Sequence, residues 1–155
     1  MSGYFGIAVW HPKTETNIGT LWRHANLYNA SFVATVGLRY RRQSSDTTNI
    51  ERSIPLTHYA DIDDLIEHLP HSCPIVGVEL DPRAKVLDGS FNHDQRALYL
   101  LGAEDHGLPP SVLDRCHRLV QIPTPNPQSM NVAVAGTLIM HDRYAKSLAR
   151  QVVAA

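Results

Sequence analysis

The sequence predicts an α/β fold with a mainly parallel sheet flanked by helices, and two observations support this class. Short apolar runs, which are typical of buried strands, alternate with segments in which apolar residues recur every three or four positions, as on one face of a helix. Strands that alternate with helices form parallel sheets. The length of 155 residues is enough for one domain with a core and short for two, so we expect a single domain over residues 1–155.

The N-terminal part of the chain predicts a β-α-β unit. Residues 5–10 form an apolar run, and a polar loop separates this run from a helix that we expect to begin near Ile18. Apolar side chains recur at helical spacing from Ile18 to Tyr28, which indicates an amphipathic helix. The β-branched run over residues 31–36 is the second strand, and a right-handed crossover would make the two strands parallel.

The middle of the chain predicts a loop, a helix and a further strand. Residues 37–55 are polar and basic, which favours a surface loop. Residues 61–69 read as a helix with an acidic start that ends before Pro70. An apolar run over residues 74–79 predicts a buried strand, and a connecting loop is expected over residues 81–92.

Two strand-end loops and the start of the last helix are expected to meet. The strands predicted over residues 98–101 and 119–122 run into a glycine-containing loop and a proline-rich loop, respectively. Ser129 or Asn131 can cap the helix that follows, which we expect to continue to about residue 148 before a frayed tail. Because ligands of open α/β sheets bind at the carboxyl ends of the strands, a binding site is predicted there.

Composition excludes several classes of function. The formal net charge is −1, so any attraction to nucleic acid must come from local patches. No run approaches the ~20 apolar residues of a spanning helix and the N-terminus lacks the pattern of a signal peptide, so we expect no membrane partner and a cytoplasmic location. Cys73 and Cys116 lack the spacing of a zinc site and the nine histidines are scattered, so no metal site is expected.

Three short motifs occur in the predicted loops, whereas the sequence contains no GxGxxG, GxxxxGK[ST], GxSxG or HExxH motif. The first is NxGxxxR over residues 17–23, the second is GxExxGL over residues 102–108, and the third is Ile-Pro at 122–123 followed by Ser-Met-Asn at 129–131. Each motif alone is explained by a helix cap or by a turn that needs glycine. All three in this order on one α/β chain are much harder to explain in that way.

With these motifs the chain resembles the SpoU (TrmH-like) branch of the SPOUT methyltransferases, over about residues 6–144. Members methylate the ribose 2′-hydroxyl of tRNA or rRNA with S-adenosyl-L-methionine. Met130 stands where many relatives have leucine, and the length is similar to that of the minimal, single-domain members. The resemblance implies a deep trefoil knot in the C-terminal part of the sheet.

The resemblance also implies where S-adenosyl-L-methionine binds, namely in the loops of the knot. Glycine lets a backbone approach a ligand closely, and adenine needs an apolar slot with a few backbone hydrogen bonds, so the residue types are suitable. The expected cofactor-binding residues are Val78, Glu79, Leu80, Leu101, Gly102, Glu104, Gly107, Ile122, Pro123, Ser129, Met130 and Asn131.

For catalysis, the resemblance implies Arg23 as the central residue, with Asn17, Glu104, Ser129 and Asn131 orienting it and the ribose. A solvated guanidinium keeps its proton at every pH below about 12, so it cannot act as a base. We therefore expect Arg23 to hold a phosphate or to stabilise the developing alkoxide, with Glu104 as its bidentate partner. The alternative for Arg23 is an ordinary solvent-facing helix residue.

The basic loop is a candidate RNA contact, and a solvated loop is an equally good interpretation. Its arginines are Arg39, Arg41, Arg42 and Arg52, and Tyr40 among them could stack on a base. The resemblance implies a homodimer and an RNA substrate, with tRNA and its wobble nucleotide favoured. A D-loop guanosine or an rRNA ribose remains the alternative substrate. A catalytically silent RNA-binding module and an unrelated small-molecule enzyme remain alternative classes.

Overall fold

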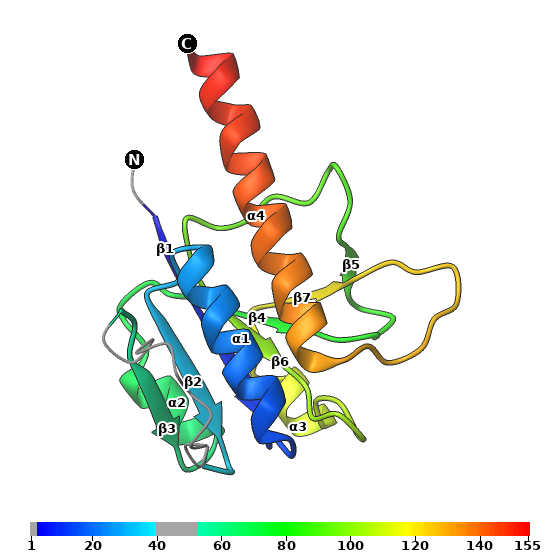
Figure 1. Cartoon of the computed structure of the whole chain (residues 1–155). Helices are drawn as coiled ribbons and strands as arrows, with labels where there is room; N and C mark the ends of the chain where they lie inside the picture. Colours follow the sequence, from blue (N-terminus) through cyan, green and yellow to red (C-terminus); the bar gives the residue numbers. More distant parts are fainter. Residues whose placement is uncertain (1–2, 40–52) are drawn as a thin grey trace.

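The structure is a computed structural model, and it describes residues 3–39 and 53–155 (Figure 1). Over these residues the chain forms a seven-stranded sheet in the order β3-β2-β1-β6-β4-β7-β5. All neighbouring strands of this order pair in parallel. The predicted α/β class with a parallel sheet is confirmed, whereas the strand order does not test the knot, which stays a prediction.

The N-terminal half follows the predicted order with two differences. Its elements are β1 (Tyr4–Trp10), α1 (Glu15–Leu27), β2 (Phe32–Val36), β3 (Leu56–Tyr59) and α2 (Ile62–His68). Helix α1 begins almost one turn before the predicted Ile18, with Glu15 as the acidic residue of its first turn. Strand β3 was not predicted, because this four-residue edge strand is only partly buried and lacks a clear apolar alternation.

The C-terminal half contains one unpredicted strand and a longer last helix. Its elements are β4 (Ile75–Val78), β5 (Lys85–Val86), β6 (Arg96–Leu101), α3 (Pro110–Leu113), β7 (Arg118–Gln121) and α4 (Val132–Ala154). The loop predicted over residues 81–92 contains β5, whose two exposed residues give no apolar signal. The predicted frayed tail after residue 148 is wrong, because α4 continues through good helix formers without glycine or proline.

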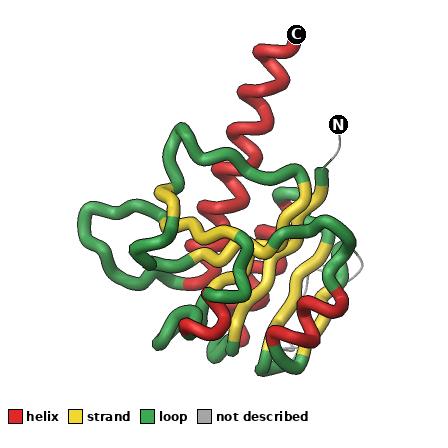
Figure 2. The backbone as a smooth tube through the Cα atoms, turned by 180° about the vertical axis from the view of Figure 1, so that it is seen from behind, coloured by secondary structure: helices red, strands yellow, loops and turns green. Residues whose placement is uncertain are grey.

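Helices cover both faces of the sheet (Figures 1 and 2). Helices α1 and α4 lie side by side on one face, where Ile7 and Leu21 belong to one buried cluster. Helices α2 and α3 lie on the other face, where Leu65 and Val112 belong to a second cluster. Because both faces are covered, the central strands are almost continuously apolar, as in strand β6.

This packing brings two helix N-termini to the carboxyl edge of the sheet. A Cβ atom on Gly136 of α4 would lie 2.4 Å from Cδ1 of Leu21, so glycine permits the close approach of α4 to α1. The first turns of α1 and α4 therefore lie beside the loops that follow β4, β6 and β7 (Figure 1). Within the described part of the chain, no helix is both long and apolar enough to cross a membrane.

Candidate active site

A pocket of about 240 Å³ lies at this carboxyl edge. Its walls come from the ends of β4 and β6, from the loops after β6 and β7, and from the first turns of α4. The lining residues are Val78, Glu79, Leu80, Leu101, Gly102, Ala103, Glu104, Asp105, His106, Gly107, Ile122, Gln128, Ser129, Met130, Val132 and Ala135. The pocket thus combines apolar side chains with carboxylates, an amide, a hydroxyl and an imidazole.

The pocket contains all of the predicted cofactor-binding residues except Pro123 and Asn131. Pro123 is exposed at the start of the long loop after β7, and the side chain of Asn131 contacts Asn17 instead. Six lining residues are not in the predicted set: Ala103, Asp105 and His106, which belong to the predicted glycine-containing loop, and Gln128, Val132 and Ala135. Val132 and Ala135 lie three positions apart, and this helical spacing after the cap at Asn131 is the signal that could have found them.

The loop between β6 and α3 is a tight turn that two glycines make possible. The backbones of Ala103 and Gly107 exchange hydrogen bonds of 2.9 and 3.3 Å. Gly107 has a φ of +62°, and a Cβ atom there would lie 2.2 Å from Oε2 of Glu79. A Cβ atom on Gly102 would lie 2.6 Å from Cα of Gly107. Gly107 is therefore needed for its φ and for space, and Gly102 for the close approach of the two backbones.

Glu79 holds this loop from the side of β4. Its Oε1 accepts a hydrogen bond from the backbone N–H of Leu80 at 2.9 Å, and its Oε2 accepts one from the N–H of Leu108 at 2.8 Å. Both carboxylate oxygens are thus occupied by backbone donors. The residue was predicted as a cofactor contact, and the structure gives it an anchoring role in the pocket wall.

A chain of hydrogen bonds joins the three sequence motifs. Oδ1 of Asn131 accepts from the N–H groups of Ala133 and Val134, at 3.0 and 3.2 Å, and so caps α4. Its Nδ2 therefore faces away from the helix and donates to Oδ1 of Asn17 at 3.0 Å. That contact leaves Nδ2 of Asn17 free to donate to Oε1 of Glu104. The predicted meeting of two strand-end loops with the start of the last helix is confirmed.

Two residues that sequence reasoning missed also hold the loop. The hydroxyl of Thr14 donates to Oε2 of Glu104 at 2.8 Å, so both oxygens of this carboxylate contact the start of α1. Lys13 forms an ion pair with Asp105, and this contact lowers the pKa of Asp105. Neither residue belongs to a motif, and no spacing in the polar loop after β1 indicates this contact.

Arg23 lies on α1, six residues after Asn17 and so about 9 Å further along the helix axis. Its side chain is exposed and has no hydrogen bond or ion pair with any residue that the structure describes. The expected pair of Arg23 with Glu104 is absent within this protomer, because the start of α1 occupies both oxygens of Glu104. The catalytic roles of Arg23 and of Ser129, which is exposed in the pocket wall, stay predictions.

The predicted basic loop lies largely outside the described residues. Tyr40, Arg41, Arg42 and Arg52 belong to that part. Arg39 is described and exposed, and its charge adds to burial in lowering the pKa of His58. Among the described residues, no group of three or more histidine, cysteine, aspartate or glutamate side chains could hold a metal ion.

A parallel sheet with a pocket at its carboxyl edge defines an α/β protein built to bind a small ligand between loops and helix N-termini. Comparison of the sequence with protein-family models is more specific. The model of the SpoU rRNA Methylase family matches residues 4–141, and the chain therefore belongs to this family. No curated protein matches the sequence.

Solved structures show the same fold. An AdoMet-bound rRNA methyltransferase from Sinorhizobium meliloti is 22% identical with a TM-score of 0.79, and the match covers 94% of this chain and 57% of that chain. The SpoU methyltransferase AviRb from Streptomyces viridochromogenes is 21% identical with a TM-score of 0.81, covering 96% and 62%. A protein studied for the 2-OH methylation of C/U34 on tRNA is 21% identical with a TM-score of 0.80, covering 95% and 98%. The chain thus spans 57% and 62% of the first two proteins.

Proposed function

We propose that the protein transfers a methyl group from S-adenosyl-L-methionine to a ribose 2′-hydroxyl of RNA. The observation that carries this proposal is the chain of hydrogen bonds from Asn131 through Asn17 to Glu104, which joins the three family motifs at one pocket. Membership of the SpoU rRNA Methylase family supports the same activity. So do the AdoMet-bound structures of the similar proteins from S. meliloti and S. viridochromogenes.

The residues of the pocket suit S-adenosyl-L-methionine, which supplies an electrophilic methyl group on a sulfonium when bound. Val78, Leu101 and Ile122 provide an apolar wall for a purine. The glycines of the tight loop have no side chain, so a ligand can lie close to the backbone there. A Cβ atom on Gly107 would also collide with the carboxylate of Glu79 in the pocket wall. Glu104 and Asp105 place negative charge near the cationic end of such a ligand.

Arg23 is suited to the substrate in this proposal. Its guanidinium has no described partner, so it is available to hold a phosphate or to stabilise the alkoxide that develops as the 2′-hydroxyl is methylated. Asn17, Glu104 and Asn131 form a rigid frame around the reacting groups, and the exposed hydroxyl of Ser129 can contact the ribose.

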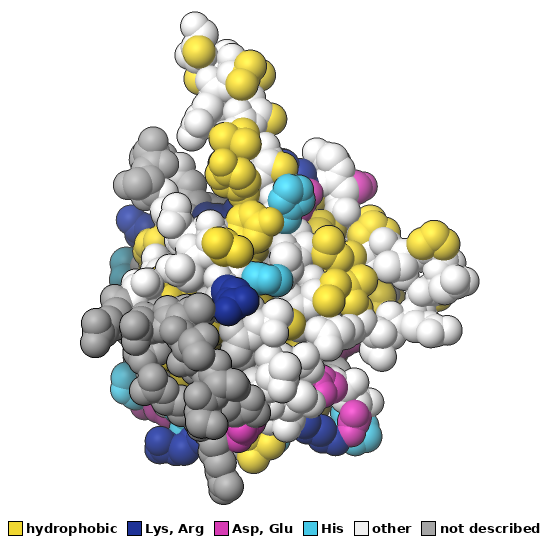
Figure 3. All heavy atoms as spheres, viewed as in Figure 1, with side chains coloured by type: hydrophobic (Ala, Val, Ile, Leu, Met, Phe, Trp, Pro, Cys, Tyr) yellow, Lys and Arg dark blue, Asp and Glu magenta, His cyan; other side chains and the backbone are white. Residues whose placement is uncertain are grey.

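A homodimer is the proposed assembly. Exposed hydrophobic side chains lie along α4, on the side of the molecule where α1 also lies. They continue onto the last turns of α4, which extend beyond the sheet (Figure 3). On α4 these residues are Val134, Leu138, Tyr144, Leu148 and Val152, and Leu27 at the end of α1 is also exposed. A second copy that covers this face would remove them from water. The resemblance implies that Arg23 of one protomer then completes the pocket of its partner.

The proposed substrate is tRNA, with the wobble nucleotide favoured, and the proposed location is the cytoplasm. One similar structure is nearly equal to this chain in length. It is the protein studied for methylation of C/U34 on tRNA, and the match covers 98% of that protein. Similarity to the rRNA methyltransferase from S. meliloti supports an rRNA ribose as the alternative substrate. A D-loop guanosine is a second alternative substrate. The presence of Asn17, Arg23, Glu104, Ser129 and Asn131 argues against a catalytically silent RNA-binding module.

Calorimetry with S-adenosyl-L-methionine, followed by tritiated-methyl transfer to bulk tRNA and to rRNA, tests the proposal. We expect stoichiometric binding and label in tRNA. The absence of binding would overturn the proposal, and label only in rRNA would overturn the choice of substrate. Arg23→Ala should keep cofactor binding and lose methyl transfer, whereas a binding module would lose only RNA affinity. Arg96→Ala, at the exposed amino end of β6 and away from the pocket, is the matched arginine control.

A further inference from the structure

Methylation of a hydroxyl requires a group that takes the proton, and the pocket wall offers few candidates. The wall contains four ionisable side chains, which are Glu79, Glu104, Asp105 and His106. A base must have a free lone pair that faces the substrate. The hydrogen bonds of these four groups therefore decide which of them can act.

Each of the three carboxylates already has a structural partner, although its oxygens keep further lone pairs. Glu79 accepts backbone hydrogen bonds at both oxygens, and Glu104 accepts side-chain hydrogen bonds at both oxygens. Asp105 is paired with the ammonium group of Lys13, which lowers its pKa and weakens it as a base. A proton transferred to any of these groups would disturb a contact that holds the loop.

His106 differs from its neighbours. Its side chain is exposed in the pocket wall, and it shares no hydrogen bond or ion pair with the residues that the structure describes. Histidine is also the residue type that most readily exchanges a proton near neutral pH. The imidazole is therefore the unoccupied proton acceptor of the wall.

The loop that carries His106 is rigid, which a base requires for correct placement. The backbones of Ala103 and Gly107 are paired on either side of the turn, Glu104 is fixed to the start of α1, and Glu79 accepts from Leu108 just after the turn. These contacts fix the residues on both sides of His106 while its ring stays free. The site is thus preorganised and needs no rearrangement to present the imidazole.

We propose that His106 is the general base of the methyl transfer, an inference that rests on the proposed function. One imidazole nitrogen takes the proton of the ribose 2′-hydroxyl as the O–H bond breaks. The oxygen lone pair forms a bond to the methyl carbon, and the electron pair of the breaking C–S bond goes to the sulfonium sulfur. The products are the 2′-O-methyl ribose, a neutral thioether and an imidazolium, which returns its proton to water.

The charges around His106 suit an imidazolium. Asp105 precedes it and interacts with it electrostatically, and the ion pair with Lys13 keeps Asp105 ionised. Glu104 from the same loop and Glu79 from the end of β4 are the other charged groups of the wall. Three carboxylates and one ammonium group therefore leave net negative charge beside the ring, which stabilises the positive charge that develops as the ring accepts the proton. Arg23 complements this role, because a guanidinium cannot accept the proton.

The test compares His106→Gln with His71→Gln under single-turnover conditions. His71 is an exposed histidine outside the pocket, on the loop before β4. General base catalysis contributes about 10²–10⁴-fold, so we expect a loss of that size in the rate for His106→Gln and none for His71→Gln. The cofactor dissociation constant, measured by calorimetry, should stay within about twofold of wild type for both variants, because neither change removes a contact of the loop.

A further readout separates a base from a structural residue. Added imidazole should partly restore transfer by His106→Ala and should not affect Arg23→Ala. A raised KM for RNA with unchanged kcat would overturn the assignment and indicate an RNA contact instead.

The outcomes also distinguish this inference from the proposed function. If the wild-type protein is active and His106→Gln is equally active, only the role of His106 is overturned. If the wild-type protein binds S-adenosyl-L-methionine and methylates neither tRNA nor rRNA, the proposed function is overturned and the role of His106 with it.

Discussion

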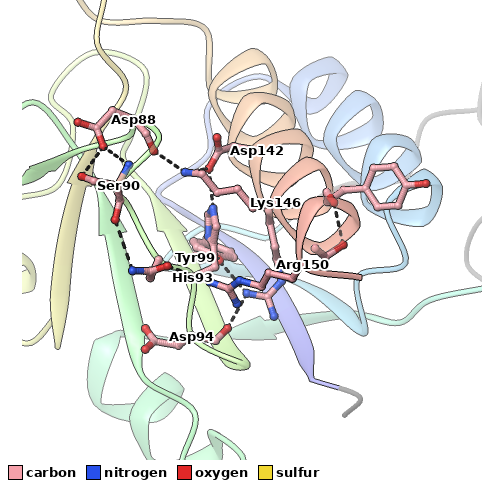
Figure 4. Close-up of polar contacts among 12 residues, drawn as sticks. Asp88, Ser90, His93, Asp94, Tyr99, Asp142, Lys146 and Arg150 are labelled. Carbon is pink, nitrogen blue, oxygen red and sulfur yellow. Dashed lines mark hydrogen bonds and ion pairs between the residues drawn. The ribbon is translucent and has the colours of Figure 1, made fainter. Parts of the chain in front are cut away.

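Two polar networks join α4 to the sheet, one at each edge, and they use similar residues differently. At the carboxyl edge, Asn131, Asn17 and Glu104 connect the first turn of α4 to the start of α1 and to the pocket loop. At the amino edge, a cluster around His93 connects the later turns of α4 to β6 and to the segment before it (Figure 4). The pocket loop at the carboxyl edge and the amino-edge cluster each contain a histidine and carboxylates, and a lysine contacts each of them.

The cluster around His93 is paired throughout, and the His93 side chain at its centre is buried. The His93 side chain is 5% exposed, and its ring nitrogens lie 2.6 Å from the Tyr99 hydroxyl and 2.8 Å from Oδ2 of Asp142. Lys146 donates to the same Asp142 oxygen at 2.7 Å. Arg143 donates to the carbonyl oxygens of Asp94 and Gln95, at 2.6 and 2.8 Å. Burial raises the pKa of Tyr99 to about 12 and lowers the pKa of His93.

The network at the carboxyl edge leaves groups unused. Among the described residues, the ring of His106, the hydroxyl of Ser129 and the guanidinium of Arg23 have no hydrogen-bond partner. Residue type alone therefore does not decide the role of a side chain. A paired and buried histidine stabilises the fold, whereas an unpaired one on a fixed loop is available for chemistry.

The largest expected effect on stability is that of Arg143→Met. Methionine keeps the aliphatic packing but leaves the carbonyls of Asp94 and Gln95 and the Tyr99 hydroxyl without their charged donor. We expect the free energy of unfolding to fall by about 3 kcal/mol, measured by urea denaturation.

Arg150→Met is the matched control for this change. Arg150 lies two turns further along α4, is exposed and donates a hydrogen bond only to Oδ1 of Asn92 among the described residues, at 2.9 Å. Its loss should cost less than about 1 kcal/mol. Cofactor affinity should be unchanged in both variants. An Arg143→Met protein as stable as wild type would show that the amino-edge cluster does not hold α4.

Gly107→Ala should produce the next largest effect, at the opposite edge. Alanine disfavours the φ of +62°, and its Cβ atom would collide with the carboxylate of Glu79. The loop must then shift, which we expect to cost about 2 kcal/mol and to weaken binding of S-adenosyl-L-methionine by at least about tenfold. Gly89→Ala is the control, because nothing lies within 4 Å of a Cβ atom there. Unchanged cofactor affinity in Gly107→Ala would place the cofactor away from this loop.

The sequence predicts the carboxyl-edge site far better than the amino-edge cluster, and the reason is physical. Asn17, Gly107 and Asn131 are recognisable because caps and tight turns restrict residue type locally, so their spacing carries information. His93 and Asp142 are far apart in sequence, and their contact depends on how α4 packs against β6. Lys13 and Thr14 escape prediction for the same reason, because only the folded chain brings them to the pocket loop.

The fold shows the same division between local and distant information. Strand β6 is predictable because five consecutive residues of it are buried. The exposed residues Lys85 and Val86 form β5 only because the edge of β7 is available for pairing. Helix α4 is longer than predicted because the frayed tail was expected from the general tendency of chain termini to be poorly ordered, although Ala149, Arg150 and Gln151 continue the helix with high propensity. Local patterns thus predict the centre of the sheet, and its edges depend on neighbours.

Asn131→Ala and Asn131→Asp separate capping from the link between motifs. Alanine removes the cap of α4 and should cost about 1 kcal/mol of unfolding free energy, together with most methyl transfer. Aspartate retains the cap but cannot donate to Asn17, so stability should stay near that of wild type while transfer still falls. Urea denaturation and the tritium assay measure the two effects. Normal transfer by Asn131→Asp would show that the link to Asn17 is dispensable.

The smallest expected effect is a pH dependence of stability that originates at the amino edge. Burial lowers the pKa of His93 in the folded protein below its ordinary 6.5, and the Asp142 carboxylate opposes this shift only in part. At a pH between the lowered pKa of folded His93 and its ordinary value of 6.5, the unfolded chain binds more protons than the folded protein. Stability therefore rises with pH in this range and should fall as the pH drops below about 6.5. Arg143 and Lys146 also face the ring and disfavour its charged form.

Urea denaturation of wild type and His93→Gln at about pH 7.5 and about pH 5.5 measures this contribution. Asp81, Asp88 and Asp105 also have lowered pKa values, but a carboxylate with a lowered pKa loses its contribution below its ordinary value of 3.8, outside this pH range. His93→Gln should therefore be less stable overall and show a shallower decrease than wild type, while His71→Gln keeps the wild-type decrease. Equal slopes in wild type and His93→Gln would place the titrating group elsewhere. Methyl transfer should persist in His93→Gln, because His93 lies at the opposite edge of the sheet from the pocket.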